Sequence, residues 1–336
     1  MTIERGLDPG RNYSQATDLI RAGKAVLIST HIRPDGDALG SMLGLALALE
    51  RLGLRVARLC ADPTPDYYAF LPGADLITST PPEWTADLGI VVDCDGLSRV
   101  NSLEPAFAAL PHLIDIDHHA TDRVFGEVQI IDSTAGACSE LVYELLLSLD
   151  LLIDQSIATC LYTGILTDTG RFSYGNTTPR SLSIAAELVR AGAEPYVIAR
   201  KVYAEHSIAA MRLLGVALSR TTAHLDGRVV SSTLMRDDFE ATDALPADTE
   251  GIIDHLRGIG GPHVALFFVQ LDNGEVRVSL RSGGAIDVSL VALALGGGGH
   301  AMAAGSTCPG TVGEVRARVL GEIEKRLPAL SADSAA

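Results

Sequence analysis

Short apolar runs alternate with longer segments of helical periodicity along the first half of the chain. The short runs are rich in Val, Ile and Leu and predict buried strands at residues 24–30, 54–60, 88–94, 112–117 and 127–132. The longer segments predict helices at residues 37–52, 134–149, 154–167 and 179–191. Strands and helices that alternate in this way indicate an α/β domain with a doubly wound, mostly parallel sheet.

The pattern changes after residue 221, where tight turns separate the apolar runs. Asp226-Gly227 and Asp272-Asn273-Gly274 are typical of β-hairpins. Helices are expected between and after these hairpins, at residues 248–258, 286–295 and 312–326. This mixture indicates a second, smaller α/β domain with a mixed sheet. We expect the active site in the cleft between the two domains.

The length of 336 residues is enough for two domains. We expect a catalytic domain and a second domain that are joined by a helical linker and followed by a disordered tail. The boundaries of these four segments are residues 1–192 for the first domain, 193–220 for the linker, 221–328 for the second domain and 329–336 for the tail.

Composition narrows the class of protein. No apolar run reaches the ~18 residues of a membrane span, and the N-terminus lacks the pattern of a secretory signal. The five cysteines never form a Cys-x-x-Cys pair, which is typical of reduced thiols in the cytoplasm. The net charge of −16 argues against binding of long duplex nucleic acid, which depends on many Lys and Arg contacts. A small anionic substrate is still compatible with this charge, and no membrane partner is expected.

Acidic and imidazole side chains stand where the predicted strands and one helix end. His31, Asp35 and Asp37 follow the strand at 24–30, and Asp93 ends the run at 88–94. The triplet Asp117-His118-His119 ends the next run, and Asp168 lies where the helix at 154–167 gives way to a loop. An Asp at the end of one strand is commonly a turn residue. Four segments that each bring Asp or His to this kind of position indicate a metal site, because open α/β sheets bind ligands there.

The ligand set also indicates the metal. Asp35, Asp37, Asp93 and Asp168 carry four negative charges, the number that neutralises two divalent cations. Imidazoles and carboxylates without thiolates suit Mn²⁺, with Mg²⁺ as an alternative and zinc or iron also compatible. Two such ions, roughly 3.5–4 Å apart, are typical of enzymes that catalyse in-line phosphoryl displacement.

These motifs resemble those of the DHH phosphoesterases, which are named after the triplet at Asp117-His118-His119. The segment from His31 to Asp37 matches the first family motif, Asp93 the second and Asp168 the fourth. Gly296 to Gly299, followed by His300, is similar to the glycine-rich element of the DHH-associated C-terminal domain. The sequence Thr167-Asp-Thr-Gly-Arg-Phe172 is similar to the corresponding motif of the NrnA-like branch of this family.

The resemblance implies an enzyme that hydrolyses short oligoribonucleotides (nanoRNA) to mononucleotides and 3′-phosphoadenosine 5′-phosphate (pAp) to AMP. Cyclic or linear dinucleotides such as c-di-AMP and pApA are further implied substrates, and a homodimer is the implied assembly. One metal would take His31, Asp35 and the bridging Asp93, and the other would take Asp37, Asp93, His118 and Asp168. His119 would face the scissile phosphate as a donor or general acid, and Asp117 would orient the imidazoles.

The glycine-rich segment also has a physical interpretation. Consecutive glycines let backbone N–H groups converge on an anion, although a flexible turn is an alternative interpretation. A polyanionic substrate needs donors beyond the metals, because the carboxylates only cancel the charge of the cations. We therefore expect substrate binding by Arg281, Ser282, Gly297, Gly298, Gly299 and His300. Arg99 and Arg171 are weaker candidates.

Three other functions are weighed against this interpretation. A DHH-superfamily inorganic pyrophosphatase is disfavoured because its second domain carries a Lys/Arg-rich substrate motif instead of the glycines. A RecJ-type DNA exonuclease is disfavoured by the size and acidity of the chain. A non-catalytic nucleotide-binding sensor would be expected to have lost metal ligands, and every expected ligand is present.

Overall fold

The computed structural model describes residues 12–119, 125–205, 207–299 and 301–327. Its contacts divide the chain into two units, Met1–Glu205 and His206–Ala336. This division falls within the stretch at 193–220 that the sequence assigns to a helical linker. That stretch forms one helix of each unit, α7 (Pro195–Tyr203) and α8 (Ile208–Ser219). The predicted tail at 329–336 lies outside the described residues.

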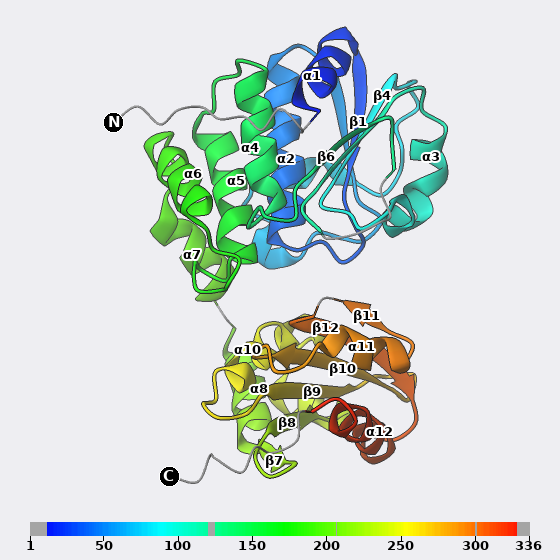
Figure 1. Ribbon diagram of the computed structural model, residues 1–336, viewed down its shortest axis with the longest axis vertical. Coiled ribbons are helices and arrows are strands. Elements are labelled where there is room, and N and C mark those ends of the chain that lie inside the picture. The colour runs from blue at the N-terminus through cyan, green and yellow to red at the C-terminus, as the bar shows by residue number, and fades with distance from the viewer. Residues whose placement is uncertain (1–11, 120–124, 206, 300, 328–336) are drawn as a thin grey trace. The chain divides into compact units, whose positions relative to one another are not determined.

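The first unit is built on a six-stranded parallel sheet with the order β3-β2-β1-β4-β5-β6 (Figure 1). Its strands are β1 (Ala25–Ser29), β2 (Arg55–Leu59), β3 (Ile77–Thr78), β4 (Leu88–Val92), β5 (Leu113–Asp117) and β6 (Val128–Ile131). The prediction of a doubly wound parallel sheet is therefore confirmed. The two-residue strand β3 is the one strand of this sheet that the apolar pattern did not predict.

Helices cover both faces of this sheet. The α-helices of the unit are α1 (Tyr13–Ala22), α2 (Gly36–Arg51), α3 (Glu104–Ala108), α4 (Cys138–Ser148), α5 (Gln155–Asp168), α6 (Pro179–Arg190) and α7. Val26 and Ile28 of β1 belong to the core shared with α2, α4 and α5, whereas Leu27 belongs to the core on the opposite face, beneath α3. Neighbouring residues of a strand point to opposite faces, so one apolar run fills both cores.

Close approach of α2 and α5 forms the centre of the larger core. A Cβ atom added at Gly40 of α2 would lie 2.4 Å from the carbonyl oxygen of Cys160 on α5. Glycine is therefore required at this crossing, because any side chain would push the two helices apart. The crossing matters for function, since α2 begins and α5 ends at predicted metal ligands.

The second unit contains a mixed sheet with the order β11-β12-β10-β9-β8-β7. The strands are β7 (Thr222–His224), β8 (Val229–Leu234), β9 (Val264–Gln270), β10 (Glu275–Ser282), β11 (Gly298–Gly299) and β12 (Ala303–Pro309). Strands β8 and β9 are parallel, and the other neighbours are antiparallel. Both predicted hairpins and the predicted mixed sheet are confirmed. No strand was predicted for β11, which lies in the glycine-rich segment, or for β12, which follows it.

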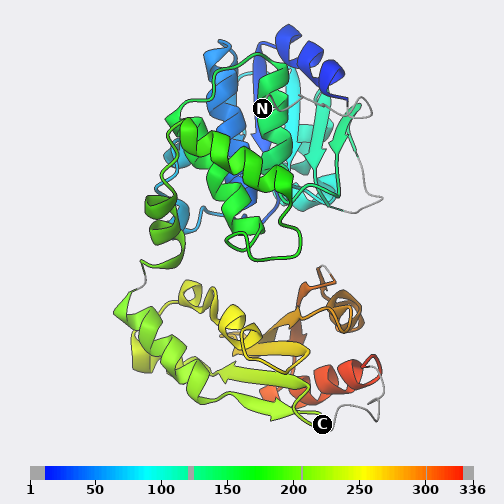
Figure 2. The same cartoon turned by 60° about the vertical axis from the view of Figure 1, so that its left-hand side comes forward.

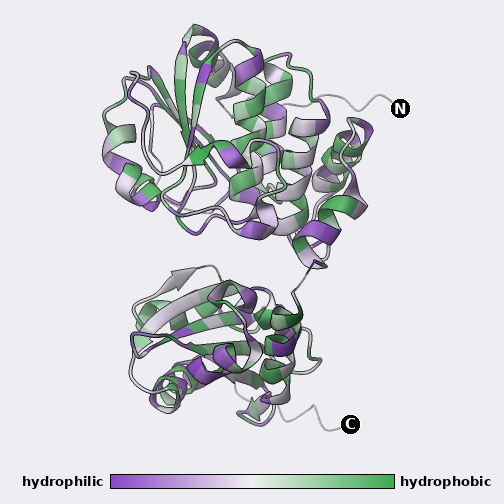
Figure 3. Ribbon diagram, turned by 180° about the vertical axis from the view of Figure 1, so that it is seen from behind, coloured by the Kyte–Doolittle hydropathy of each residue, from purple (hydrophilic) through white to green (hydrophobic). Residues whose placement is uncertain are grey.

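Helices pack on both sides of this second sheet as well (Figure 2). They are α8, α9 (Arg236–Thr242), α10 (Ile252–Arg257), α11 (Val288–Ala294) and α12 (Val312–Glu324). Phe268 of β9 packs with α11 and α12, and its neighbour Phe267 packs with α8 and α10. In both units hydrophobic residues occupy the central strands (Figure 3). Among the described residues, no helix is long and apolar enough to cross a membrane, and the cytoplasmic location stays a prediction.

Candidate metal centre

The candidate centre lies at the carboxyl ends of three neighbouring strands, β1, β4 and β5. The chain runs from β1 outward to β2 and β3, then returns to β4 on the other side of β1 and continues to β5 and β6. The strand order therefore reverses between β1 and β4, which is where open α/β sheets form their binding crevice. His31 follows β1 by two residues, and Asp93 follows β4 directly.

The turn between β1 and α2 orients the first two candidate ligands. The Nδ1 atom of His31 donates to the carbonyl of Ile32 at 2.8 Å, which leaves Nε2 directed at Oδ2 of Asp93, 3.7 Å away. Oδ1 of Asp35 accepts the backbone N–H groups of Asp37 and Ala38, each at 3.0 Å, and caps α2. A histidine whose one nitrogen is held by a carbonyl presents the other as a metal ligand.

Asp37 is buried against the beginning of α4. Its Oδ2 atom accepts the N–H of Cys138 at 2.5 Å, and its Oδ1 atom accepts the N–H of Ser139 at 3.0 Å. The hydroxyl of Ser41 donates to Oδ1 as well, at 3.2 Å. The exposed amides and dipole of a helix N-terminus stabilise negative charge. The fold therefore holds this carboxylate in one orientation before any cation binds.

Asp93 is the central residue of the centre. It is 2% exposed and has a left-handed backbone with φ 53°, which costs free energy for a residue other than glycine. Its Oδ1 atom is buried without a hydrogen-bond partner among the described residues. That atom lies 3.4 Å from Nε2 of His118 and 3.8 Å from Nδ1 of His119. A buried carboxylate oxygen without a donor is the arrangement that a cation would satisfy.

His118 directs one nitrogen toward three carboxylates. Its Nδ1 atom donates to the carbonyl of Ala135 at 3.3 Å. Its Nε2 atom lies 3.9 Å from Oδ2 of Asp37 and 3.7 Å from Oδ2 of Asp168, in addition to its approach to Asp93. Burial lowers the pKa of His118, but Asp93 and the neighbouring carboxylates raise it well above its usual value, so Nε2 carries a proton before a metal binds. In the neutral ring the proton is on Nδ1 and the lone pair of Nε2 is directed to the side of the carboxylates. This is the tautomer that binds a metal through Nε2.

Asp117 orients His119 instead of joining the carboxylate group. Its Oδ1 atom accepts the Nδ1–H of His119 at 2.6 Å and the backbone N–H groups of His118 and His119 at 2.8 and 3.2 Å. A carboxylate that holds Nδ1 fixes the ring and presents Nε2 to a ligand. Although burial lowers the pKa of His119, the Asp117 carboxylate raises it above the usual value.

Among the residues that the structure describes, three groups of side chains could each hold a metal ion, because the ligand atoms within each group lie within 4.8 Å of one another. They are His31–Asp35–Asp93, Asp37–His118–Asp168 and Asp93–His118–His119. The first two contain no residue in common, and Asp93 approaches His118 of the second. Imidazole nitrogens and carboxylate oxygens are donors that suit divalent cations such as Mn²⁺. The first two groups could therefore each hold a divalent cation, and Asp93 of the first group lies next to His118 of the second.

The pKa values of several groups in this centre are raised when no cation is bound. Burial and the charge of Asp93 raise the pKa of Asp37 to about 7, and burial raises the pKa of Asp168 well above its usual value. Burial lowers the pKa of His31, but Asp93 and Asp35 raise it to about 9. Crowded carboxylates and imidazoles that retain protons in this way have a strong preference for bound positive charge.

The structure adds residues that the sequence pattern did not single out. Cys138 and Ser139 donate backbone N–H groups to Asp37, and Asn176 donates to Asp168 through its side chain at 3.4 Å. Cys138 and Ser139 open α4, whereas the helix predicted from the sequence begins at residue 134, so the prediction did not place their N–H groups at a helix N-terminus. For Asn176 we find no signal in the sequence.

Among the predicted substrate-binding residues, the described ones all belong to the second unit. Arg281 on β10 lies 3.6 Å from Asp254, and Ser282 is buried with its hydroxyl donating to the carbonyl of Ile286. Gly298 and Gly299 form β11, and Gly297 has no room for a side chain because an added Cβ would lie 2.1 Å from Gly305. His300 lies outside the described residues. Their role in substrate binding stays a prediction.

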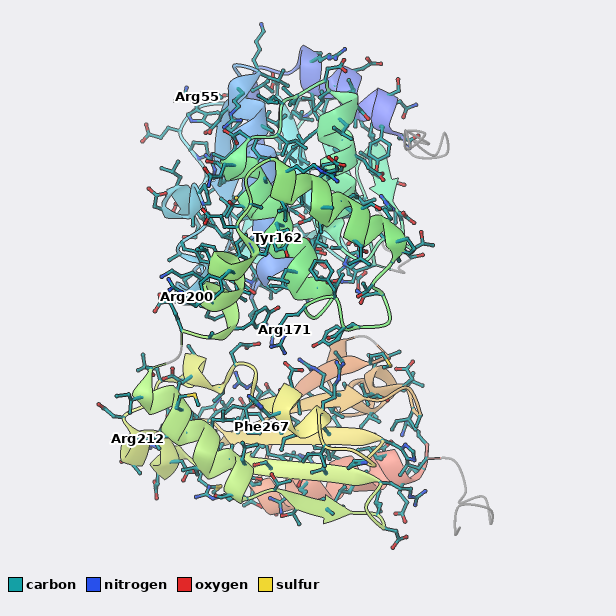
Figure 4. The ribbon with its side chains drawn as sticks, turned by 90° about the vertical axis from the view of Figure 1, so that its left-hand side faces the viewer. Arg55, Tyr162, Arg171, Arg200, Arg212 and Phe267 are labelled. Carbon is teal, nitrogen blue, oxygen red and sulfur yellow. The ribbon has the colours of Figure 1, made fainter. Side chains whose placement is uncertain are left out.

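The two weaker arginine candidates have different surroundings. Arg171, which Figure 4 labels, is exposed and has a left-handed backbone with φ 62°. Its guanidinium carbon lies over the ring of Tyr203, 4.7 Å from the ring centroid. Arg99 has a buried Nε atom without a partner among the described residues, and its carbonyl accepts the N–H of Ile32. Arg99 therefore supports the turn that carries His31.

Comparison with known families gives two matches along the chain. Residues 25–165 match the DHH family, N-terminal domain, and residues 226–328 match the DHHA1 domain. The first match contains the predicted ligands except Asp168. The second contains the glycine-rich segment.

Comparison with named proteins gives relatives that match along most of their length. The bifunctional oligoribonuclease and PAP phosphatase NrnA of Thermus thermophilus is 35% identical over 311 residues, which cover 90% of each chain. The NrnA protein of Bacillus subtilis is 28% identical, over 87% of this chain and 92% of that protein. The cyclic-di-AMP phosphodiesterase GdpP of Geobacillus thermodenitrificans is 30% identical over 88% of this chain, which spans 47% of GdpP.

Comparison with solved structures also gives matches along most of this chain. An exopolyphosphatase-related protein from Bacteroides fragilis superimposes with a TM-score of 0.88 at 29% identity, covering 93% of this chain and 95% of that one. RecJ of Thermus thermophilus in complex with Mn²⁺ superimposes with a TM-score of 0.53 at 15% identity, over 93% of this chain and 54% of RecJ, which shows similarity of fold. The chain belongs to the DHH family of phosphoesterases, in the NrnA-like branch that carries a DHHA1 domain.

Proposed function

We propose that this protein is a metal-dependent phosphodiesterase and phosphatase that acts on short oligoribonucleotides and on pAp. The products would be mononucleotides from RNA and AMP from pAp. The observation that carries the proposal is the position of Asp93, which belongs to the group His31–Asp35–Asp93 and whose unpartnered buried Oδ1 lies 3.4 Å from Nε2 of His118 in the group Asp37–His118–Asp168. Similarity to the NrnA proteins along 90% of the chain supports the choice of substrates. Similarity to GdpP supports cyclic or linear dinucleotides as further substrates.

We further propose that two divalent cations, Mn²⁺ in the first place and Mg²⁺ as an alternative, are the cofactors. His31 and Asp35 would hold one cation, Asp37, His118 and Asp168 the other, and Asp93 would contact both. When bound, the cations supply positive charge to the phosphoryl oxygens and lower the pKa of the attacking water. The Mn²⁺ complex of RecJ, which shares this fold, supports the choice of metal.

His119 would act on the leaving group. Its Nδ1 atom is held by Asp117, so Nε2 is the nitrogen that can reach a substrate. The raised pKa of His119 favours the protonated imidazole, which can donate a proton to the departing nucleoside oxygen. Asp117 would stabilise the ring in this orientation and would not exchange protons with substrate.

The second unit would bind phosphate. Arg281 has a partly exposed guanidinium that is paired with Asp254 at 3.6 Å, a distance at which the pair is weak enough to exchange for a phosphate. The backbone of Gly298 and Gly299 is exposed and lies at the edge of the sheet. We propose these groups and His300 as donors for the substrate, and a homodimer as the assembly. The hydroxyl and N–H of Ser282 and the N–H of Gly297 already donate to carbonyl oxygens of the second unit, so we propose that these two residues shape the phosphate site without donating to the substrate.

The substrate proposal is tested by comparing hydrolysis rates in the presence of Mn²⁺. We expect release of mononucleotides from 5′-labelled RNA of two to five nucleotides and release of phosphate from pAp. If pyrophosphate is consumed while RNA and pAp persist, the protein is instead a pyrophosphatase. If nucleotides bind and none of the substrates reacts, it is a sensor. Parallel rates on pApA and c-di-AMP rank the dinucleotides.

A further inference from the structure

One side-chain amide connects two parts of the candidate metal centre. The Nδ2 atom of Asn176, in the loop between α5 and α6, lies 2.9 Å from the carbonyl oxygen of Gly136. The same atom lies 3.1 Å from the carbonyl oxygen of Asp168 and 3.4 Å from its carboxylate oxygen Oδ2. A single NH₂ group therefore joins the end of α5 to the segment that leads into α4.

Gly136 is connected to Asp37 through the first residues of α4. Gly136 precedes Ala137, the N-cap of α4, and the next two residues donate their N–H groups to Asp37. Gly136 is fixed on both sides: its N–H donates to Glu140 at 3.2 Å, and an added Cβ would lie 2.8 Å from the backbone oxygen of Asn176. Movement at Gly136 would therefore move the amides that hold Asp37.

The orientation of the Asn176 amide is determined by its neighbours. Its Oδ1 atom is buried and has no hydrogen-bond partner among the described residues. Rotation of the amide by half a turn would place this oxygen against two carbonyls and a carboxylate, all of which are acceptors. The NH₂ group therefore faces Asp168 even though the carbonyl of the amide is left without a donor, which is costly for a buried group.

We propose that Asn176 is a positioning residue of the metal centre. It orients the Asp168 carboxylate and the beginning of α4 together, so that Asp168 and Asp37 serve one cation with His118. This inference rests on the metal centre of the proposed function. The side-chain hydrogen bonds of Asn176 involve Gly136 and Asp168 and none of His31, Asp35 and Asp93. Its effect is therefore confined to one of the two ions.

Asp62 has a comparable position beside the residues proposed for the other ion, His31 and Asp35. Oδ2 of Asp62 accepts the backbone N–H of Arg33 at 2.8 Å. Arg33 stands between His31 and Asp35 and has a left-handed backbone with φ 54°, so the turn depends on this contact. Asp62 belongs to none of the three groups of metal-binding side chains. Asp62→Ala is therefore a matched control for Asn176→Ala, because Asp62 contacts the turn that carries His31 and Asp35 and is not a proposed ligand itself.

The test is a titration of the full-length, metal-free protein with Mn²⁺, followed by electron paramagnetic resonance of the free ion. For Asn176→Ala we expect one ion bound with wild-type affinity and the other about 10-fold to 100-fold weaker, as for other outer contacts of metal ligands. The loss should be smaller in an Asp168→Asn background, where only the contact with Gly136 still matters, and should persist in full in an Asp35→Asn background. For Asp62→Ala we expect the opposite: its loss of Mn²⁺ affinity should be smaller in the Asp35→Asn background and should persist in the Asp168→Asn background. Excess Mn²⁺ should restore the activity of Asn176→Ala.

A variant of the same loop separates positioning from general destabilisation. Thr178 accepts the N–H of Ser181 and caps α6, so Thr178→Ala should lower the midpoint of thermal unfolding and leave the Mn²⁺ titration unchanged. Two ions of wild-type affinity in Asn176→Ala overturn the inference and leave the proposed function standing. Equal weakening of both ions in Asn176→Ala, or weakening in Thr178→Ala, also overturns it. Fewer than two ions in the wild type overturn both proposals.

Discussion

Oδ1 of Asp37 accepts the backbone N–H of Ser139 at 3.0 Å, across 102 residues of sequence. This bond connects the first turn of α2 to the first turn of α4 and holds a proposed metal ligand on a helix N-terminus. The orientation of the ligand thus depends on how closely α2, α4 and α5 pack. Packing and metal binding should therefore respond to the same substitutions.

Gly164→Ala should lower both stability and Mn²⁺ affinity. A Cβ atom at Gly164 of α5 would lie 2.0 Å from Oγ of Ser139 and 2.6 Å from Oδ1 of Asp37, so these groups have to move. Overpacking of this kind costs about 1–3 kcal/mol in free energy of unfolding. Chemical denaturation and a Mn²⁺ titration measure the two effects.

Gly215→Ala is the matched control on α8. An added Cβ there meets no atom within 4 Å, and the residue lies inside a helix. Alanine in a helix interior is favoured over glycine by about 0.5–1 kcal/mol, so this variant should be more stable than the wild type. Gly164→Ala with unchanged stability and metal affinity would show that the crossing of α2 and α5 tolerates a side chain.

Much of the first unit follows from the sequence because its signals are local. An apolar run that ends in Asp93, or in Asp117-His118-His119, specifies both the strand and the position of the side chains at its end. Because the ends of neighbouring parallel strands meet at one edge, the sequence brings these residues into one centre. The structure does bring His31, Asp35, Asp37, Asp93, His118 and Asp168 together.

Contacts that depend on tertiary packing could not be derived in this way. The amide of Asn176 reaches Gly136 across 40 residues, and no periodicity encodes that contact. The left-handed φ of Asp93 is imposed by its surroundings, since most residues avoid this conformation. In the second unit, Gly298 and Gly299 pair with β12 as an edge strand, although glycine is depleted in strands and was interpreted as a turn or anion nest.

Asp93→Asn should abolish turnover and preserve the fold. Asparagine has the same shape and tolerates the left-handed backbone, so the change removes mainly the charge shared by the two cations. We expect kcat/KM to fall by more than about 100-fold, since even outer contacts of metal ligands cost about 10-fold to 100-fold. Hydrolysis of an RNA dinucleotide and circular dichroism measure activity and fold.

Asp150→Asn is a suitable control for that charge removal. Asp150 also has a left-handed backbone, with φ 56°, and its side chain is exposed beside Arg21. Its substitution should leave kcat/KM within about twofold of the wild type, because exposed ion pairs contribute little. If the kcat/KM of Asp93→Asn equals that of this control, the Asp93 carboxylate is not required for catalysis.

The neighbours His118 and His119 should separate metal binding from proton transfer. His119→Ala should keep two bound Mn²⁺ ions and lower kcat by about 10²-fold to 10⁴-fold, the usual contribution of a general acid. His118→Ala should weaken one ion, because its Nε2 faces Asp37 and Asp168. Loss of an ion in His119→Ala would instead assign a metal to the group Asp93–His118–His119.

Mn²⁺ affinity should rise with pH. In the metal-free protein, Asp93 and Asp35 raise the pKa of His31 to about 9 against the effect of burial, and burial with the charge of Asp93 raises that of Asp37 to about 7. A cation has to displace these protons, so the apparent Kd should increase about tenfold per displaced proton for each pH unit below 7. Calorimetry in two buffers of different ionisation enthalpy should detect proton release, and equal Kd values at pH 6 and pH 8 would contradict the account.

The most direct test of the central claim is a Mn²⁺ titration of the metal-free wild type in which bound ions and hydrolysis of an RNA dinucleotide are measured in the same samples. The account predicts two ions per chain, little turnover with one ion bound, and full turnover when the second site fills, since both groups around Asp93 contribute to the reaction. Full turnover with one ion bound, or turnover that persists in EDTA, would contradict a two-metal centre.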